Sequence, residues 1–162
     1  MGGPKGELQV NDQPILEYLL DRLAWPGPTL LVTAPAREHP PGWRRFGAEA
    51  VDAVAGQGPL RGLLTAAGAA RTEILAVATV DMPGIRSVQL EWFIAQLLAD
   101  RRRLGVMCSR KTEHRQSEVE PFPLVLRTAS RRVLHRRLKS GRLSVRELVE
   151  EPGFLAVPSP PD

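Results

Sequence analysis

Two aspartates stand at the points where predicted β-strands stop. Asp52 ends the segment Glu49–Asp52, and Asp81 directly follows the apolar segment Ile74–Val80. In α/β proteins, ligands bind beyond the carboxyl ends of the strands, where a carboxylate could hold a Mg²⁺ that also bridges phosphate oxygens. The other interpretation of Asp81 is a structural one, in which its carboxylate accepts backbone N–H bonds in the turn Met82–Gly84. The position of Asp81 thus suits phosphoryl chemistry and leaves a structural role open.

Two glycine-rich segments could contribute to binding a phosphate. The loop Gly56–Gly62 enters a predicted helix, where unpaired N–H groups and the helix dipole can receive a phosphate or the edge of a base. The segment Gly2–Gly6 presents Lys5 as a point charge, although it is neither a Walker motif nor a dinucleotide fingerprint. An ordinary turn and a solvated lysine are the alternative interpretations.

Other kinds of site are disfavoured by residue type and spacing. His39, His114 and His135 are far apart and have no zinc-ligand spacing. Cys108 is the single cysteine, which excludes an intramolecular disulfide and a cysteine-based metal cage, and we interpret it as a small buried hydrophobe. No apolar run approaches the roughly 18 residues that span a bilayer, and the start lacks a signal-peptide core. We therefore expect a cytoplasmic protein with no membrane partner.

Length and charge indicate one domain with an anionic ligand. The 162 residues fit a single domain at roughly 100–200 residues per domain. With 43% apolar and 25% charged residues the chain should fold, and its net charge of +4 favours anionic ligands. The basic segments Arg101–Arg103 and Thr128–Lys139 could bind phosphodiesters. One Tyr and four Phe offer few stacking platforms, so we do not expect nucleic acid as a partner.

Alternating strand and helix patterns predict right-handed βαβ units and a mostly parallel sheet covered on both faces. Helices are predicted over residues 14–23, 60–70, 87–98 and 128–139. Strands are predicted over 29–33, buried on both faces, and over 74–80, the clearest buried strand. Further strands are predicted over 49–52, 104–108 and 122–126. Pro123 should push the last of these to an edge or a bulge. Residues 109–120 are expected to form an exposed loop.

Periodicity also predicts how the basic helix and the tail pack. Val133 and Leu134 should face inward, and Arg136 and Arg137 should face largely outward. The tail Pro152–Asp162 contains several prolines, so we expect it to be loosely packed.

Four segments, taken in order, carry a resemblance to a known family. They are Met1–Gly6, Val51–Asp52, Gly58–Leu63 and Val80–Gly84. In order and spacing they resemble the molybdenum cofactor guanylyltransferases, the MobA-type nucleotidyltransferases, and the likeness covers nearly the whole chain. The resemblance implies an α/β fold of three layers, α/β/α. Its mostly parallel, Rossmann-like sheet is of the nucleotide-diphospho-sugar transferase type.

The resemblance also implies an activity and a set of site residues. The activity is transfer of GMP from Mg²⁺-bound GTP to molybdopterin, and protein partners in molybdenum cofactor biosynthesis would follow. By match, Lys5 and Asp81 are catalytic, and Asp81 binds Mg²⁺. The nucleotide is assigned to Lys5, Thr33, Asp52, Gly58, Pro59 and Leu60. Thr33 stands where the family has an asparagine that contacts the nucleotide.

The sequence departs from the family at both ends. The family's first strand and its Leu-Ala-Gly-Gly loop would lie upstream of Met1. We therefore expect residues 1–162 to form a single domain, truncated at the N-terminus relative to the family, with a sheet that lacks its first strand. Ala156 and Pro158 replace two asparagines of the family. A gene product that begins upstream and a relative without turnover are both open interpretations. The alternative functions are a non-catalytic nucleotide- or partner-binding protein and a related cytidylyl- or sugar-nucleotidyltransferase.

Overall fold

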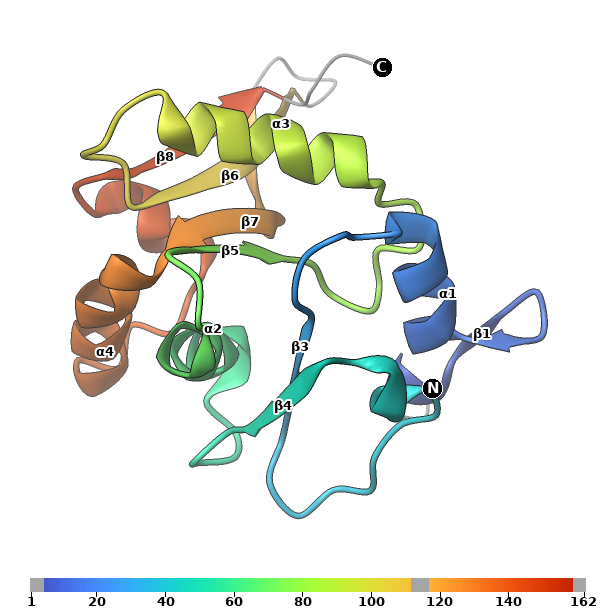
Figure 1. The fold of residues 1–162 in the computed structure, drawn as a ribbon. Coiled ribbons are helices and arrows are strands. Elements are labelled where there is room, and N and C mark those ends of the chain that lie inside the picture. Colours follow the sequence, from blue (N-terminus) through green and yellow to red (C-terminus); the bar gives the residue numbers. More distant parts are fainter. Residues whose placement is uncertain (1–4, 112–116, 159–162) are drawn as a thin grey trace.

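The computed structural model describes residues 5–111 and 117–158 (Figure 1). Its α-helices are α1 (Ile15–Leu23), α2 (Gly58–Ala69), α3 (Ser87–Leu98) and α4 (Arg131–Lys139). Its strands are β1 (Gln9–Val10), β2 (Gln13–Pro14), β3 (Leu30–Thr33), β4 (Ala48–Val51), β5 (Ile74–Val77), β6 (Gly105–Lys111), β7 (Ser117–Arg127) and β8 (Phe154–Pro158). Within these residues no helix is long and apolar enough to cross a bilayer.

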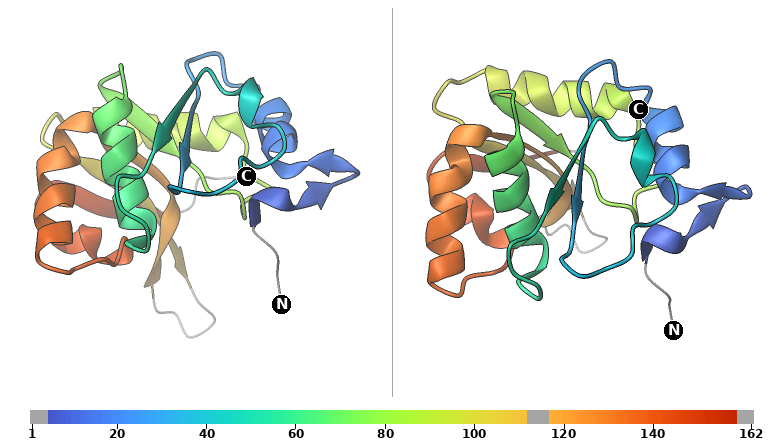
Figure 2. Two further views of the ribbon diagram at one scale, coloured as in Figure 1. Left: turned by 90° about the horizontal axis from the view of Figure 1, so that it is seen from below. Right: turned by 60° about the horizontal axis from the view of Figure 1, so that its bottom comes forward.

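The described strands form separate sheets with helices on both faces. β1 and β2 make a short antiparallel hairpin, β3 and β4 make a parallel pair, and the four-stranded sheet has the order β5-β7-β6-β8. Helix α3 lies over one face of the four-stranded sheet, and α2 and α4 cover the other (Figures 1 and 2). The α/β prediction is confirmed, and the helices take up the layers expected of them.

The prediction of a mostly parallel sheet is wrong, because β7 runs antiparallel to both β5 and β6. The cause lies in the chain between β6 and β7. β6 ends at Lys111 and β7 begins at Ser117. The connection between them is shorter than the crossover of a dozen or more residues that joins parallel strands. The predicted loop over 109–120 is accordingly wrong at both of its ends, which belong to β6 and β7.

The prediction that Pro123 places residues 122–126 at an edge or a bulge is confirmed by a bulge, which lies within the central strand β7. Met107 of β6 pairs with Leu124, and the next residue, Cys108, pairs with Glu120. The three skipped positions of β7 contain Pro121 and Pro123. Proline has no N–H for the ladder, so a bulge lets a central strand contain both.

β3 and β5 are confirmed as strands, but the predicted burial, on both faces for β3, is wrong. All residues of β3 and of β5 are half-buried. Each strand has a neighbour on one side only among the described residues. β5 also stops at Val77, earlier than predicted. Val77 pairs with Leu124, and beyond it the bulge around Pro123 offers no straight partner.

The basic helix α4 packs on α2 and buries one arginine that was predicted to face outward. Arg137 is 1% exposed, and its guanidinium donates to Glu147 Oε2 at 2.8 Å and to Glu151 Oε1 at 3.1 Å. Val133 and Leu134 face inward as predicted. The helical period places Arg137 on the same face, where Glu151, itself 8% exposed, neutralises it.

The predicted loose tail is also wrong over the part that the structure describes. β8 pairs in parallel with β6, with Gly105 opposite Phe154. Phe154 is buried, and a Cβ added to Gly105 would lie 2.5 Å from its ring. Glycine at position 105 thus leaves the space that the Phe154 ring fills. Residues 159–162 of the tail lie outside the described residues.

Candidate functional site

The carboxyl ends of β3 and β4 lie together because the two strands are parallel and in register. The Asp52 N–H donates to the carbonyl of Thr33 at 2.8 Å, which holds the residue after β4 beside the last residue of β3. One carboxylate oxygen of Asp52, Oδ1, is buried and has no hydrogen-bond partner among the described residues. A buried acceptor without a donor is uncommon and costs free energy, so this oxygen is suited to a donor on a ligand.

The start of α2 faces the same region through a glycine-rich turn. Gly56 and Gly58 have φ values of 80° and 64°, which side chains other than glycine rarely adopt. A Cβ at either position would meet nothing within 4 Å, so backbone conformation explains these glycines better than packing does. The first N–H groups of the 12-residue helix α2 have no partner within the helix and can receive an anion.

The other predicted residues at the start of α2 differ in what they can contribute. Pro59 occupies the first turn of α2, where its missing N–H disrupts no helical hydrogen bond. The Leu60 side chain is fully buried in the core, so only its backbone can contact a ligand. Gln57 accepts from Nε of Arg61 at 2.7 Å, which fixes the polar side chain just before the helix.

Thr33 contacts a glutamate that the sequence interpretation missed. Its hydroxyl donates to Oε1 of Glu49 at 2.6 Å, and His39 Nε2 lies 3.0 Å from the same oxygen. The Thr33 hydroxyl, and secondarily His39, hold the pKa of Glu49 below its ordinary value. His39 in turn stacks on Trp43 with ring centroids 4.0 Å apart. Thr33 is thus part of a polar cluster that anchors the loop between β3 and β4.

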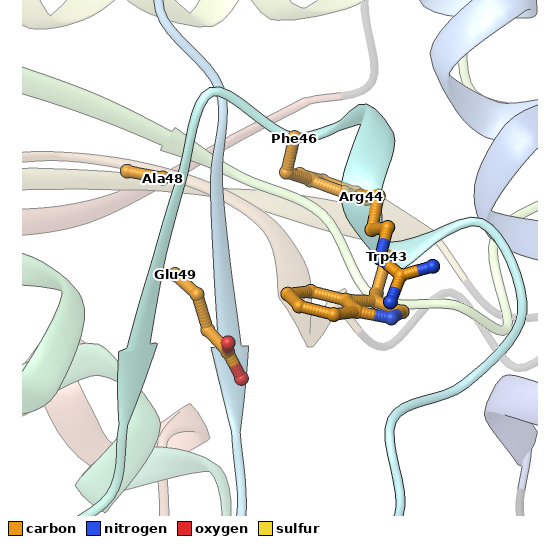
Figure 3. A pocket seen from close by; sticks show the side chains of 5 residues that line it. All are labelled: Trp43, Arg44, Phe46, Ala48 and Glu49. Atoms are coloured by element: carbon orange, nitrogen blue, oxygen red, sulfur yellow. The ribbon is translucent and has the colours of Figure 1, made fainter.

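A pocket of about 430 Å³ opens beside this cluster (Figure 3). It is lined by Trp43, Arg44, Phe46, Ala48 and Glu49. The Arg44 guanidinium lies 5.3 Å from the centre of the Trp43 ring, on which His39 also stacks. The sequence indicated this pocket only through Trp43, an aromatic residue inside a proline-rich loop. No spacing rule links Trp43 to Glu49.

Asp81 lies in a turn four positions beyond the end of β5 and is positioned by α1. The Thr79 hydroxyl donates to Oδ1 of Asp81. Val80 and Met82 pack against the apolar face of α1. Arg22 of α1 donates from Nε to the carbonyl of Ile85 at 3.1 Å. The prediction that Asp81 follows a strand directly is therefore wrong, because the ladder of β5 ends before it.

The structure brings Thr33 and Asp52 together but does not join them to Asp81. No hydrogen bond or ion pair links Asp52 to Asp81 within the part of the chain described. The side chain of Lys5 lies outside the described residues. Its neighbour Gly6 lies against the loop after β3, since an added Cβ there would be 2.9 Å from Pro40 Cβ.

Among the described residues, the donor set fits a Mg²⁺ that arrives with a nucleotide better than a metal held by side chains alone. Within the described ranges no group of three or more His, Cys, Asp or Glu could hold a metal ion. Mg²⁺ in nucleotide sites is typically bound by one or two carboxylates together with phosphates and water. Asp81 can supply one such carboxylate.

Comparisons with known proteins show the family of the chain from its sequence and the fold from solved structures. Residues 1–153 match the MobA-like NTP transferase domain family. The molybdenum cofactor guanylyltransferase of Shewanella loihica is 25% identical over 146 residues, which are 89% of this chain and 70% of that protein.

Two solved structures share the fold. Molybdopterin-guanine dinucleotide biosynthesis protein A of Archaeoglobus fulgidus has a TM-score of 0.72 at 18% identity, covering 95% of this chain and 74% of that one. The 2-C-methyl-D-erythritol 4-phosphate cytidylyltransferase of Thermus thermophilus has a TM-score of 0.67 at 19% identity, covering 98% and 85%.

Proposed function

Because the chain belongs to the MobA-like NTP transferase domain family, we propose that it transfers GMP from GTP to the phosphate of molybdopterin and releases pyrophosphate. The observation that carries the proposal is the buried, unpaired Oδ1 of Asp52 at the carboxyl end of a parallel strand pair. Ligands of open α/β sheets bind at this end. Fold similarity alone does not choose among nucleotides, so the choice of GTP rests on the similarity to the molybdenum cofactor guanylyltransferase of Shewanella loihica.

Asp52 and the start of α2 would bind the nucleotide in different ways. The carboxylate of Asp52 accepts hydrogen bonds from N–H or O–H donors of the base or ribose. The free N–H groups at the start of α2 and the turn at Gly56 and Gly58 are donors, and they would receive anionic or carbonyl oxygens. Thr33 would act through its contact with Glu49, by fixing the loop beside the pocket.

Lys5 and Asp81 would act on the triphosphate. Asp81 would hold Mg²⁺, which supplies charge neutralisation on the phosphate oxygens when it is bound. Lys5 would add a further positive charge near the phosphates. In-line attack of one phosphate on another is held back mainly by repulsion between anions, so positioning and charge neutralisation are sufficient for catalysis.

Calorimetric titration of the full chain with GTP, CTP and ATP, each with and without Mg²⁺, tests this proposal. We expect Mg²⁺-dependent binding of GTP, lost in Asp81→Ala. A matched control is Asp100→Ala, which removes a half-buried carboxylate paired with Arg102 and should leave GTP binding unchanged.

The titration also separates the proposed function from its alternatives. Binding of CTP in preference to GTP would indicate a cytidylyltransferase. GTP binding without pyrophosphate release in the presence of molybdopterin would indicate a non-catalytic relative. A folded protein that binds no nucleotide would refute the proposal.

A further inference from the structure

The net positive charge of the chain is concentrated in one segment. Residues 121–146 contain eight Lys and Arg and no Asp or Glu, whereas the whole chain contains 22 basic and 18 acidic residues. The rest of the chain is therefore net acidic, and the charge of +4 comes entirely from this segment. Such an asymmetry gives one part of the surface a positive potential and favours an anionic partner there.

Carboxylates neutralise only some of these cations. The cations with a carboxylate oxygen within 4.0 Å are Arg127, Arg136, Arg137, Arg142 and Arg146. Three others, Arg131, Arg132 and Lys139, have no hydrogen bond or ion pair among the described residues. All three belong to α4 and are exposed. The unpaired charge therefore lies on the outer face of this helix.

One further unpaired cation, Arg71, lies beside α4. It follows the end of α2, is exposed and has no partner in the described part of the chain. The Thr128 N–H donates to the carbonyl of Glu73 at 2.8 Å, which joins the segment after α2 to the segment before α4. A Cβ at Gly68 of α2 would lie 3.6 Å from the guanidinium carbon of Arg131. With the exposed His135 of α4, these cations form the basic surface: Arg71, Arg131, Arg132, His135 and Lys139.

The stability of α4 does not explain these residues. Arg131 and Arg132 occupy the first turn of the helix, where the helix dipole disfavours positive charge. Arg132 and Arg136 are both exposed and four positions apart, a spacing at which like charges on a helix repel. Acidic side chains would stabilise the first turn instead. A binding role explains the basic side chains better than folding does.

The core holds the basic surface in a fixed orientation. The opposite face of α4 is buried through Val133, Leu134 and Leu138, which pack in one cluster with Leu60 and Leu63 of α2. α2 lies between α4 and the strand pair of β3 and β4 (Figures 1 and 2). The outer face of α4 is thus separate from the candidate nucleotide site.

Exposed carboxylates limit the basic surface at both ends. Glu73 lies beside Thr128 at one end. At the other end Glu150 pairs with Arg142, three positions beyond the end of α4. The helix between these ends is about 12 Å long, at about 1.5 Å per residue. A surface of this length suits a short run of carboxylates, whereas a nucleic-acid backbone would continue into the flanking Glu residues.

The residue types of the segment also favour a protein over a nucleic acid. Residues 123–146 contain no Phe, Tyr or Trp on which a base could stack. Most of the unpaired cations are arginines, whose planar guanidinium groups can donate two parallel hydrogen bonds to one carboxylate.

We propose that the basic surface binds a short acidic segment of another protein, with several Asp or Glu side chains within about 12 Å of one another. Charge complementarity of this kind speeds association and selects the partner. Since the surface is separate from the nucleotide site, this interaction does not depend on nucleotidyl transfer.

Fluorescence anisotropy with labelled peptides tests this interaction. The probe is octaglutamate, titrated with the full chain at low salt and at about 0.15 M salt, and octaglutamine is the uncharged reference. We expect octaglutamate to bind at both salt concentrations, more weakly at the higher one because salt screens surface charges. Octaglutamine should not bind.

A triple variant removes the unpaired cations of α4. Arg131→Gln, Arg132→Gln and Lys139→Gln together should weaken octaglutamate binding about tenfold, because each exposed ion pair contributes only modestly. Gln has nearly the helix propensity of Arg and Lys, so α4 should be kept, and thermal unfolding checks this. Arg71→Gln, which lies outside α4, should by itself weaken binding about twofold.

The matched control removes the same charge elsewhere. Arg37→Gln, Arg101→Gln and Arg102→Gln together remove three exposed cations outside the basic surface. This second triple variant should leave octaglutamate binding at about 0.15 M salt unchanged.

Several results would overturn the proposal. One is a folded chain that does not bind octaglutamate, and another is equal binding by the two triple variants. A third is tighter binding of octathymidylate that the α4 variant also loses, since the partner would then be a nucleic acid. The last is a dimer of the free chain that the α4 variant abolishes, since the occupant would then be a second copy.

Discussion

Asp52→Ala should raise stability while it weakens nucleotide binding. Oδ1 of Asp52 is buried without a partner among the described residues, and an unsatisfied buried acceptor costs about 1–3 kcal/mol. Asp52 is only half-buried, so we take the lower end, about 1 kcal/mol. For a chain of 162 residues this corresponds to a rise in Tm of about 2–4 °C. The backbone bond from the Asp52 N–H to Thr33 is kept.

The same change should weaken GTP binding by about tenfold or more, because a hydrogen bond to a charged group contributes about 1.5–3 kcal/mol. Thermal unfolding and calorimetric titration measure the two effects on one sample. Asp21→Ala is the control: Asp21 accepts from Gln13 and Arg45, so its loss should lower stability slightly and leave GTP binding unchanged. An Asp52→Ala protein that is less stable than the original and binds GTP equally well would refute the reasoning.

Three further predictions concern the packing that supports the site. Arg137→Met leaves Glu151 buried without its main partner, so the free energy of unfolding should fall by about 3 kcal/mol and the Tm by about 6–12 °C. The control is Arg132→Met at an exposed position, which should change the free energy of unfolding in chemical denaturation by less than about 0.5 kcal/mol. Burial raises the pKa of Glu151, but hydrogen bonds from Arg137 and Arg136 outweigh it and the net pKa is lowered. The ion pair therefore stabilises the fold above the pKa of Glu151 in the unfolded chain, about 4.3, and this stabilisation is lost as the pH falls through the lower pKa of Glu151 in the folded protein. Acid should accordingly lower the Tm of the original protein more than the Tm of Arg137→Met. Gly105→Ala would place a Cβ 2.5 Å from the Phe154 ring and should lower the free energy of unfolding by about 1–3 kcal/mol. Adding Phe154→Leu should recover part of that loss, and a double variant that recovers none would contradict the clash.

Local patterns predicted the elements well because they depend on neighbouring residues. The apolar spacing of α1 and the proline at its start predicted a helix that the structure places over Ile15–Leu23. The prediction of a mostly parallel sheet failed, since strand direction depends on the length of the β6–β7 connection and not on the composition of either strand. Arg137 was misplaced because periodicity assigns a face but does not reveal a buried carboxylate such as Glu151.

The geometry around the candidate site residues, whose roles stay predictions, could be predicted from the sequence only in part. Asp52 lies at the predicted strand end, and its neighbour Thr33 is held there by register. The side-chain partner of Thr33 could not be foreseen, because contact with Glu49 depends on the alignment of β3 with β4. Asp81 lies farther from its strand than predicted, because the end of β5 is decided by the bulge in β7.

Pyrophosphate release on mixing the full chain with GTP, Mg²⁺ and molybdopterin tests the central claim most directly. The proposed function predicts release that requires all three components and that Asp81→Ala abolishes. A folded protein that binds GTP but releases no pyrophosphate, or that releases it equally well with Asp81→Ala, would contradict guanylyl transfer at this site.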